Sequence, residues 1–183
     1  MSDKSALVII DVQQGLIDGF EDDWYEVLPV VSALGSRARA AGAPVVVIQH
    51  CGSGLAHPLH RDQPGWALHP SVDAQPADLC VEKRWSDAFR GTDLDAVLRT
   101  AAVTRLVLVG AQTELCVDAT ARRALSLDYD VDLVADGHTT SANEILTREQ
   151  IIAHHNASLV NLAVDGVALS VLPARDVTFT SQP

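Results

Sequence analysis

Three residues of different chemical types, Asp11, Lys83 and Cys116, each lie just after a short apolar run of the sequence. The thiolate is the reactive form of cysteine, but an unperturbed thiol is mostly protonated at neutral pH. An aspartate could take the thiol proton and pass it to a leaving amine, and a lysine ammonium would favour both the thiolate and the aspartate anion. Together these residue types suit attack on an amide or a similar carbonyl group.

The cysteine lies within the segment GAQTELCVDATARRA, residues 110–124. Thr113 is a candidate N-cap, which would place Cys116 in the first turn of a helix. The backbone N–H groups there lack intrahelical partners and favour negative charge. They could hold the oxyanion of a tetrahedral intermediate, and one such donor typically lowers the barrier by about 3 kcal/mol.

Apolar runs that alternate with helical patterns must position these residues. Strands are predicted over residues 6–10, 44–48, 79–81, 106–109, 131–135 and 167–172. Helices are predicted over residues 24–38, 92–98, 117–125 and 151–164, the last after a capping-box pattern of Thr147 and Gln150. This alternation predicts one α/β domain over residues 1–183, with a three-layer, six-stranded parallel sheet and helices on both faces. Sites in such sheets lie beyond the carboxyl ends of the strands, where Asp11, Lys83 and Cys116 stand.

Charge and composition exclude several classes of partner. The formal net charge is −11, which argues against binding to nucleic acid or anionic membranes, since both need clustered Lys and Arg. No apolar run approaches the ~18 residues of a membrane span, and the first residues lack the features of a signal peptide. The three cysteines are therefore expected to be free thiols of a cytoplasmic protein, with Cys51 and Cys80 as small core residues.

The motifs around the three residues resemble those of the isochorismatase-like cysteine hydrolases, which include nicotinamidase, N-carbamoylsarcosine amidohydrolase and ureidoacrylate amidohydrolase. ALVIIDVQQG resembles the first strand of that family with its Asp-x-Gln, EKRWSDAFRGTDLDAVL its lysine segment, LVLVGAQTELCVDATARRA its nucleophile segment, and VADGHTT also fits. The resemblance implies Asp11, Lys83 and Cys116 as a catalytic triad. It also implies a cis peptide between Ala111 and Gln112, which turns backbone N–H groups toward the oxyanion, and assembly as a homodimer or homotetramer.

The histidine-rich stretch VIQHCGSGLAHPLHRDQPGW departs from the metal-binding members of the family. Those members, such as nicotinamidase, resemble Asp-x-His with a further histidine after the second strand. Here the candidate aspartate position is not filled, and the His-x-x-His spacing lacks a helical frame and a clear carboxylate partner. We therefore expect no metal and no other cofactor.

Several residues are candidate contacts for a small-molecule substrate. Gln13 and Gln112 could orient it, although Gln13 could equally satisfy the polar groups of its own loop. His50 is expected at the pocket wall, and Trp85, like Trp66, could either stack on a substrate ring or pack in the core. Cys51 could line the pocket without reacting, and the long segment 49–78 is expected to shape specificity.

The sequence therefore predicts a cysteine-dependent hydrolase that cleaves a C–N bond of a small molecule through a thioester. The bond could be that of an amide, a carbamoyl group or a lactam. One alternative is a vinyl-ether hydrolase of the isochorismatase type, although such members do not use a cysteine nucleophile. A second alternative is a non-catalytic ligand-binding or scaffold protein that keeps the fold and a relict triad. Taken one at a time, Asp11 could merely cap a turn and Lys83 could merely pair with Glu82.

Overall fold

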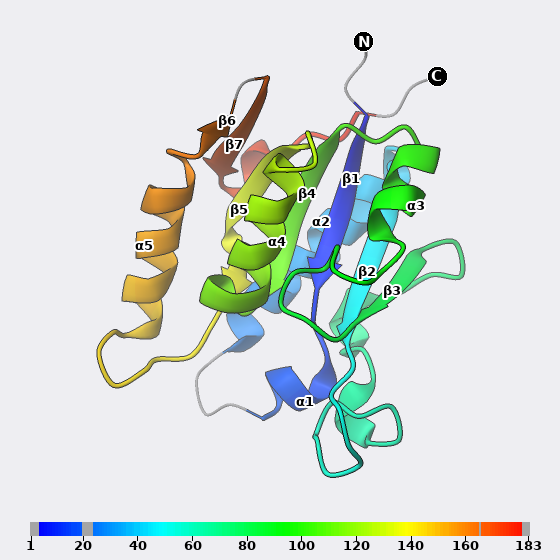
Figure 1. The fold of residues 1–183 in the computed structure, drawn as a ribbon, viewed down its shortest axis with the longest axis vertical. Helices are drawn as coiled ribbons and strands as arrows, with labels where there is room; N and C mark the ends of the chain where they lie inside the picture. Colours follow the sequence, from blue (N-terminus) through cyan, green and yellow to red (C-terminus); the bar gives the residue numbers. More distant parts are fainter. Residues whose placement is uncertain (1–3, 20–23, 165, 181–183) are drawn as a thin grey trace.

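Six parallel strands form the central sheet of the computed structural model, which describes residues 4–19, 24–164 and 166–180 (Figure 1). These strands are β1 (Ser5–Ile10), β2 (Val45–His50), β3 (Leu79–Lys83), β4 (Arg105–Ala111), β5 (Asp130–Thr139) and β7 (Val167–Leu172). The two-residue strand β6 (Ala163–Val164) pairs antiparallel with β7 and completes the order β3-β2-β1-β4-β5-β7-β6. The predicted six-stranded parallel sheet is confirmed.

Helices cover both faces of this sheet. The α-helices are α1 (Gln14–Ile17), α2 (Leu28–Ala40), α3 (Leu94–Thr100), α4 (Asp118–Leu125) and α5 (Arg148–Leu159). Helices α3 and α4 lie in front of the sheet in Figure 1 and α2 lies behind it. Shorter 3-10 turns span Trp24–Val27, Pro64–Trp66, Pro70–Val72 and Ala174–Asp176. The result is a layer of helices on each side of the strands.

The alternation of side chains along β1 explains why two cores form. All six residues of β1 are buried, as expected for a central strand that is covered on both faces. Ala6, Val8 and Ile10 pack with residues of α3 and α4, whereas Leu7 and Ile9 pack with residues of α2. A continuous apolar run in the sequence therefore becomes a strand that serves two cores.

Two predictions about individual elements are wrong. Cys80 is exposed rather than a core residue, because β3 is an edge strand on which alternate side chains face outward. The last helix ends at Leu159 instead of continuing to residue 164, because Ala163 and Val164 form the strand that pairs with β7. It also begins at Arg148, three residues earlier than predicted, but the predicted capping box of Thr147 and Gln150 is confirmed.

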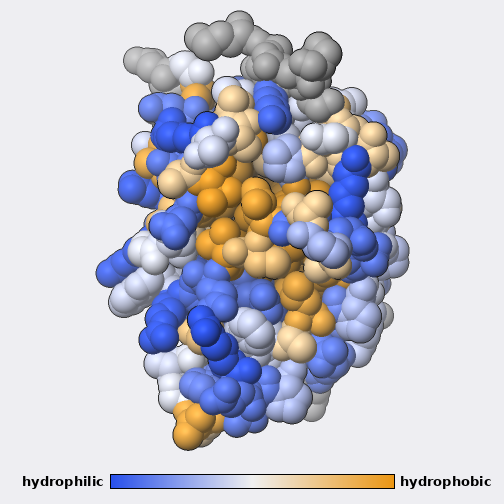
Figure 2. Space-filling model, turned by 90° about the vertical axis from the view of Figure 1, so that its right-hand side faces the viewer, coloured by the Kyte–Doolittle hydropathy of each residue, from blue (hydrophilic) through white to orange (hydrophobic). Residues whose placement is uncertain are grey.

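The exposed edge of the sheet carries an apolar surface. Figure 2 shows apolar side chains gathered on the face that includes this edge, where Leu79 of β3 lies beside Ala96, Val97 and Ala101 of α3. In the ranges that the structure describes, every helix is too short or too polar to cross a membrane.

Candidate active site

The carboxyl ends of three strands bring Asp11, Lys83 and Cys116 together. Asp11 directly follows β1, Lys83 ends β3, and Cys116 lies five residues beyond the end of β4. The Lys83 Nζ lies 2.6 Å from Asp11 Oδ2 and 3.1 Å from Cys116 Sγ. Lys83 pairs with Asp11 and not with its neighbour Glu82, which instead binds Arg61.

A single turn of π-helix, Thr113–Val117, carries the cysteine into the site. The Val117 N–H donates to the Gln112 carbonyl oxygen over 3.1 Å, a bond between residues five apart. Such π-turns are rare and are frequent at functional sites. Thr113 is not the N-cap that the sequence suggests: Gln112 holds the N-cap position with extended backbone, and Thr113 turns its hydroxyl toward His138.

The backbone around the site adopts conformations that most residues avoid. Asp11 has φ of 53°, in the left-handed region that costs a non-glycine residue energy, although aspartate tolerates it better than most. Gly110 has φ of 120°, and a Cβ at this position would lie 2.0 Å from the Ile10 carbonyl oxygen. The glycine therefore lets β4 approach β1 closely beside Asp11. The peptide bond between Ala111 and Gln112 is cis.

The sulfur differs from its two charged neighbours in how deeply it is buried. Asp11 and Lys83 are each 1% exposed, whereas Cys116 is only partly buried. Burial by itself lowers the pKa of the Lys83 ammonium, but the Asp11 carboxylate and the Cys116 sulfur raise that pKa above its usual value. Lys83 is therefore a cation at physiological pH, and the sulfur is the most exposed of the three groups.

The thiol itself is protonated in this resting arrangement. Burial and the Asp11 carboxylate raise the pKa of Cys116 to about 12, and the opposing effect of Lys83 is smaller. Lys83 favours the thiolate, as expected, but it does not keep the sulfur ionised, because desolvation and a second anion outweigh one cation.

The structure places Gln13 in a supporting position. Its Nε2 donates to the carbonyl oxygens of His50 (3.1 Å) and Trp66 (2.8 Å), and its Oε1 accepts from the His50 N–H (2.8 Å). The side chain is fully buried. These bonds favour the alternative in which Gln13 pairs with backbone polar groups instead of a substrate. They also connect the end of β2 to the turn at Trp66.

The other candidate substrate contacts lie nearer the surface. His50 is partly buried at the end of β2, and burial followed by the Lys83 charge lowers its pKa, so its ring is neutral at physiological pH. Gln112 is partly buried and directly precedes the turn that carries Cys116. Trp85 is 51% exposed, and the guanidinium carbon of Arg90 lies 3.7 Å from the centre of its ring.

The histidines of segment 49–78 stabilise turns. The Nδ1 atoms of His57, His60 and His69 each accept a hydrogen bond from the backbone N–H two residues later, at 3.1 to 3.2 Å. Within the described residues, no group of three or more His, Cys, Asp or Glu side chains is arranged to hold a metal ion. Cys51 is buried beside the end of β3, where its N–H donates to the Lys83 carbonyl oxygen.

Little in the sequence indicates a buried chain of hydrogen bonds that begins at Thr113 in the π-turn Thr113–Val117. His138 Nδ1 lies 2.9 Å from the Thr113 hydroxyl, and its Nε2 lies 2.9 Å from Asn156 Oδ1. Because an amide oxygen can only accept, Nε2 carries the proton and Nδ1 accepts from Thr113. Burial lowers the pKa of His138 to about 4, so the ring is neutral. The only signal was the histidine of VADGHTT, whose partners lie elsewhere in the sequence.

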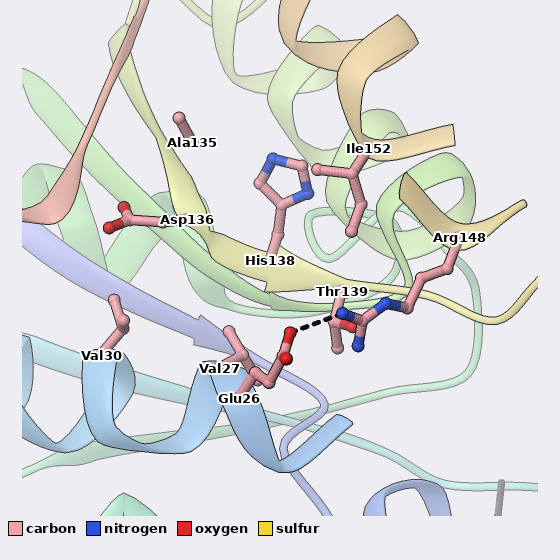
Figure 3. A pocket seen from close by; sticks show the side chains of 9 residues that line it. All are labelled: Glu26, Val27, Val30, Ala135, Asp136, His138, Thr139, Arg148 and Ile152. Atoms are coloured by element: carbon pink, nitrogen blue, oxygen red, sulfur yellow. Dashed lines mark hydrogen bonds and ion pairs between the residues drawn. The ribbon is translucent and has the colours of Figure 1, made fainter. Parts of the chain in front are cut away.

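A separate cavity of about 250 Å³ adjoins this histidine. The cavity lies between β5, α5 and the segment where the 3-10 turn Trp24–Val27 leads into α2. Figure 3 shows Arg148 reaching across it to Glu26. These two side chains form an ion pair of 2.5 Å. Asp11, Lys83 and Cys116 do not line this cavity, so it is distinct from the site around the sulfur.

Comparison with known proteins places this fold and these motifs in one family. The sequence model of the isochorismatase domain matches residues 5–164. Streptothricin hydrolase from Streptomyces noursei is 41% identical over 138 residues, which are 74% of this chain but only 49% of that enzyme. The chain thus spans about half the length of this relative. Ureidoacrylate amidohydrolase from Pseudomonas syringae pv. syringae (strain B728a) is 28% identical over 170 residues, covering 73% of this chain and 69% of the relative.

A solved structure extends the match to nearly the whole chain. An isochorismatase family protein from Burkholderia thailandensis superposes with a TM-score of 0.77 at 28% identity, covering 97% of this chain and 95% of the other. The family match covers strands β1 to β5 and the segments that carry Asp11, Lys83 and Cys116. The chain belongs to the isochorismatase family.

Proposed function

We propose that the protein is a cysteine hydrolase that cleaves a C–N bond of a small molecule, in an amide, a carbamoyl group or a lactam. The observation that carries this proposal is that Lys83 Nζ contacts both other side chains. It lies 3.1 Å from Cys116 Sγ and 2.6 Å from Asp11 Oδ2. A nucleophile, a proton acceptor and a fixed cation thus lie in one cluster, of which only the sulfur is partly exposed. Two relatives whose names describe hydrolysis, streptothricin hydrolase and ureidoacrylate amidohydrolase, support it.

The first half of the reaction forms a thioester. The Cys116 thiol transfers its proton to the Asp11 carboxylate as the sulfur attacks the carbonyl carbon of the substrate. Backbone N–H groups near Gln112 and Cys116 stabilise the oxyanion. The protonated Asp11 then gives its proton to the leaving nitrogen, the C–N bond breaks, and ammonia or an amine departs.

The second half restores the enzyme. Asp11 takes a proton from a water molecule as the water attacks the thioester carbon, and the C–S bond then breaks. The Cys116 sulfur leaves with the proton that Asp11 holds, and the substrate is released as an acid. Lys83 keeps its proton throughout and compensates the negative charge that passes between the carboxylate and the sulfur. Chain residues and water suffice for every step.

The test is a panel of small amides, ureido compounds and lactams, in which release of ammonia or amine is measured. We expect the wild type to cleave at least one class and Cys116→Ala to lose at least about a thousandfold in rate. Cys80→Ala is the matched control, because it removes a second thiol that is exposed on β3 and lies outside the site. Retention of activity by Cys116→Ala would contradict the thioester route, as would vinyl-ether cleavage that survives this change.

A further inference from the structure

A bulge in β5 shapes the cavity of about 250 Å³ that adjoins His138. Between two consecutive register contacts, β4 has the single residue Val109, whereas β5 has residues 134–137. A Cβ on Gly137 would lie 2.8 Å from the Val134 side chain, so this glycine permits the tight bulge. Bulges re-aim side chains and are frequent beside active sites. The bulged part of β5 forms one wall of the cavity.

The wall of this cavity includes a buried hydroxyl group that no protein group satisfies. Thr139 is 3% exposed, and within the ranges that the structure describes its Oγ1 is buried without a hydrogen bond. A buried hydroxyl without a partner costs free energy, and a ligand group that bonds to it removes that cost. Figure 3 shows Thr139 at the end of the cavity where Arg148 meets Glu26.

The groups around this hydroxyl favour a neutral ligand that both donates and accepts hydrogen bonds. Glu26 binds Arg148 through Oε2, which leaves Oε1 as an acceptor, and Arg148 also pairs with Glu149. Asp136 adds a second carboxylate to the lining, and both ring nitrogens of His138 are already hydrogen-bonded. Two carboxylates against one guanidinium disfavour an anionic ligand. The other walls are apolar side chains, those of Val27, Val30, Ala135 and Ile152.

Two residues of the cavity wall contact the segment that carries the nucleophile. His138 Nδ1 accepts a hydrogen bond from the Thr113 hydroxyl, which begins the π-turn Thr113–Val117. Thr139 is paired in register with Ala111, the last residue of β4. Energetic coupling between two sites can travel through packed side chains and hydrogen bonds of this kind. The cavity therefore connects to the π-turn, although Cys116 does not line it.

We propose that this cavity is a regulatory site that binds a small primary amide or ureido compound with a compact apolar body. The carbonyl oxygen of the ligand accepts from the Thr139 hydroxyl, its N–H donates to Glu26 Oε1, and its body lies against the apolar walls. Occupancy restrains β5 and, through it, the π-turn, which lowers the reactivity of the Cys116 thiol. Binding at this cavity is independent of the proposed C–N hydrolysis.

Calorimetry tests the chemistry of the ligand with isovaleramide, isovalerate and 3-methylbutylamine, which share one carbon skeleton. The Cys116→Ala variant is used so that no probe is hydrolysed during the titration. We expect isovaleramide to bind at least about fivefold more tightly than the acid or the amine, because only the amide is neutral and both donates and accepts. Equal affinities, tighter binding of the acid or the amine, or no binding of the amide would overturn the proposal.

Two pairs of variants locate the bound amide. Thr139→Val removes the hydroxyl and should weaken isovaleramide binding at least about threefold. Thr140→Val is its control, because Thr140 is also buried, its hydroxyl also lacks a partner among the described residues, and it does not line the cavity. Glu26→Ala should likewise weaken binding, whereas Glu149→Ala, which removes another acidic partner of Arg148, should not. Binding that neither Thr139→Val nor Glu26→Ala changes would overturn the proposal.

Alkylation of Cys116 in the wild type tests the connection to the active site without any turnover. The rate of its reaction with iodoacetamide is measured by mass spectrometry of peptides, with and without saturating isovaleramide. We expect the amide to slow alkylation of Cys116 at least about fivefold and to leave the exposed Cys80 unchanged. Thr139→Val should need more amide for the same effect.

Two results would overturn the regulatory role. Alkylation that an amide bound in this cavity does not slow would show that the cavity and the thiol are uncoupled. Slowing at the same amide concentration in the wild type and in Thr139→Val would show that the amide shields Cys116 directly. Because none of these measurements needs turnover, a protein that binds the amide here but cleaves no compound of the panel would contradict only the proposed hydrolysis.

Discussion

At the scale of single residues, Asp11 has two opposing effects on the nucleophile. It is the group that accepts the thiol proton in the proposed reaction, and its charge also helps to hold that proton on the sulfur, because it raises the pKa of Cys116 after burial does. In the proposed reaction the thiol is therefore protonated at rest, and its proton moves as the sulfur attacks the carbonyl carbon. Such a site protects its thiol from casual oxidation and alkylation, which act on the thiolate.

This opposition gives a prediction for Asp11→Asn. Removing the carboxylate should lower the pKa of Cys116, so its alkylation by iodoacetamide at neutral pH should become faster, while turnover falls by about a hundredfold or more because the proton acceptor is gone. Mass spectrometry of peptides separates Cys116 from Cys51 and Cys80. Asp62→Asn, on the exposed loop, should change neither rate. Slower alkylation in Asp11→Asn would show that the carboxylate promotes the thiolate instead of opposing it.

At the scale of secondary-structure elements, hydrogen bonds connect the π-turn Thr113–Val117, which carries Cys116, to β5 and through it to α5. Thr113 of the turn binds His138 of β5, His138 binds Asn156 of α5, and Asn156 Nδ2 donates to the Ala135 carbonyl oxygen. The chain of bonds links three elements that pack near the carboxyl ends of the strands. Its loss should therefore affect both the stability of the fold and the position of the turn.

The corresponding prediction concerns Asn156→Leu. This change leaves the His138 Nε2–H buried without an acceptor, which should reduce the free energy of unfolding in urea by about 1 to 3 kcal/mol. Asn161→Leu is the control, because Asn161 is exposed and its side chain donates to the Ala157 carbonyl oxygen near the end of α5. We expect its effect to be within about 0.5 kcal/mol. Equal losses in the two variants would mean that the buried chain of bonds contributes nothing specific.

The same elements show what the sequence could and could not predict. The continuous apolar runs were sufficient to predict the parallel sheet. The sheet in turn predicted that Asp11, Lys83 and Cys116 lie together at the carboxyl ends of its strands. The bonds between His138 and Asn156, by contrast, depend on how a helix packs on a strand, which no local pattern encodes. The raised pKa of Cys116 depends in the same way on burial, so residue types alone gave the wrong sign.

At the scale of the whole molecule, His138 links the stability of the fold to pH. Its pKa falls from the ordinary value of 6.5 to about 4 on folding, so the unfolded chain binds the proton more readily than the folded one. The stability that comes from the neutral His138 ring is fully present above pH 6.5. It is lost as the pH falls toward 4, because protonation then favours the unfolded chain. The shift corresponds to about 3 kcal/mol.

We therefore predict that the wild type loses stability between pH 6.5 and pH 4 more steeply than His138→Gln, although the variant is less stable at neutral pH. Urea unfolding across this interval measures the difference in slope. His154→Gln, an exposed histidine of α5, should follow the wild-type curve. Parallel curves for the wild type and His138→Gln would mean that the buried ring is not the group that resists protonation.

The most direct test of the proposed chemistry is the covalent intermediate itself. The wild type is mixed with the compound of the panel that it cleaves fastest, quenched in acid during turnover, digested and mapped by mass spectrometry. The account predicts an acyl group, attached as a thioester, on the peptide that contains Cys116. Turnover accompanied by an acyl group on a different residue would contradict it.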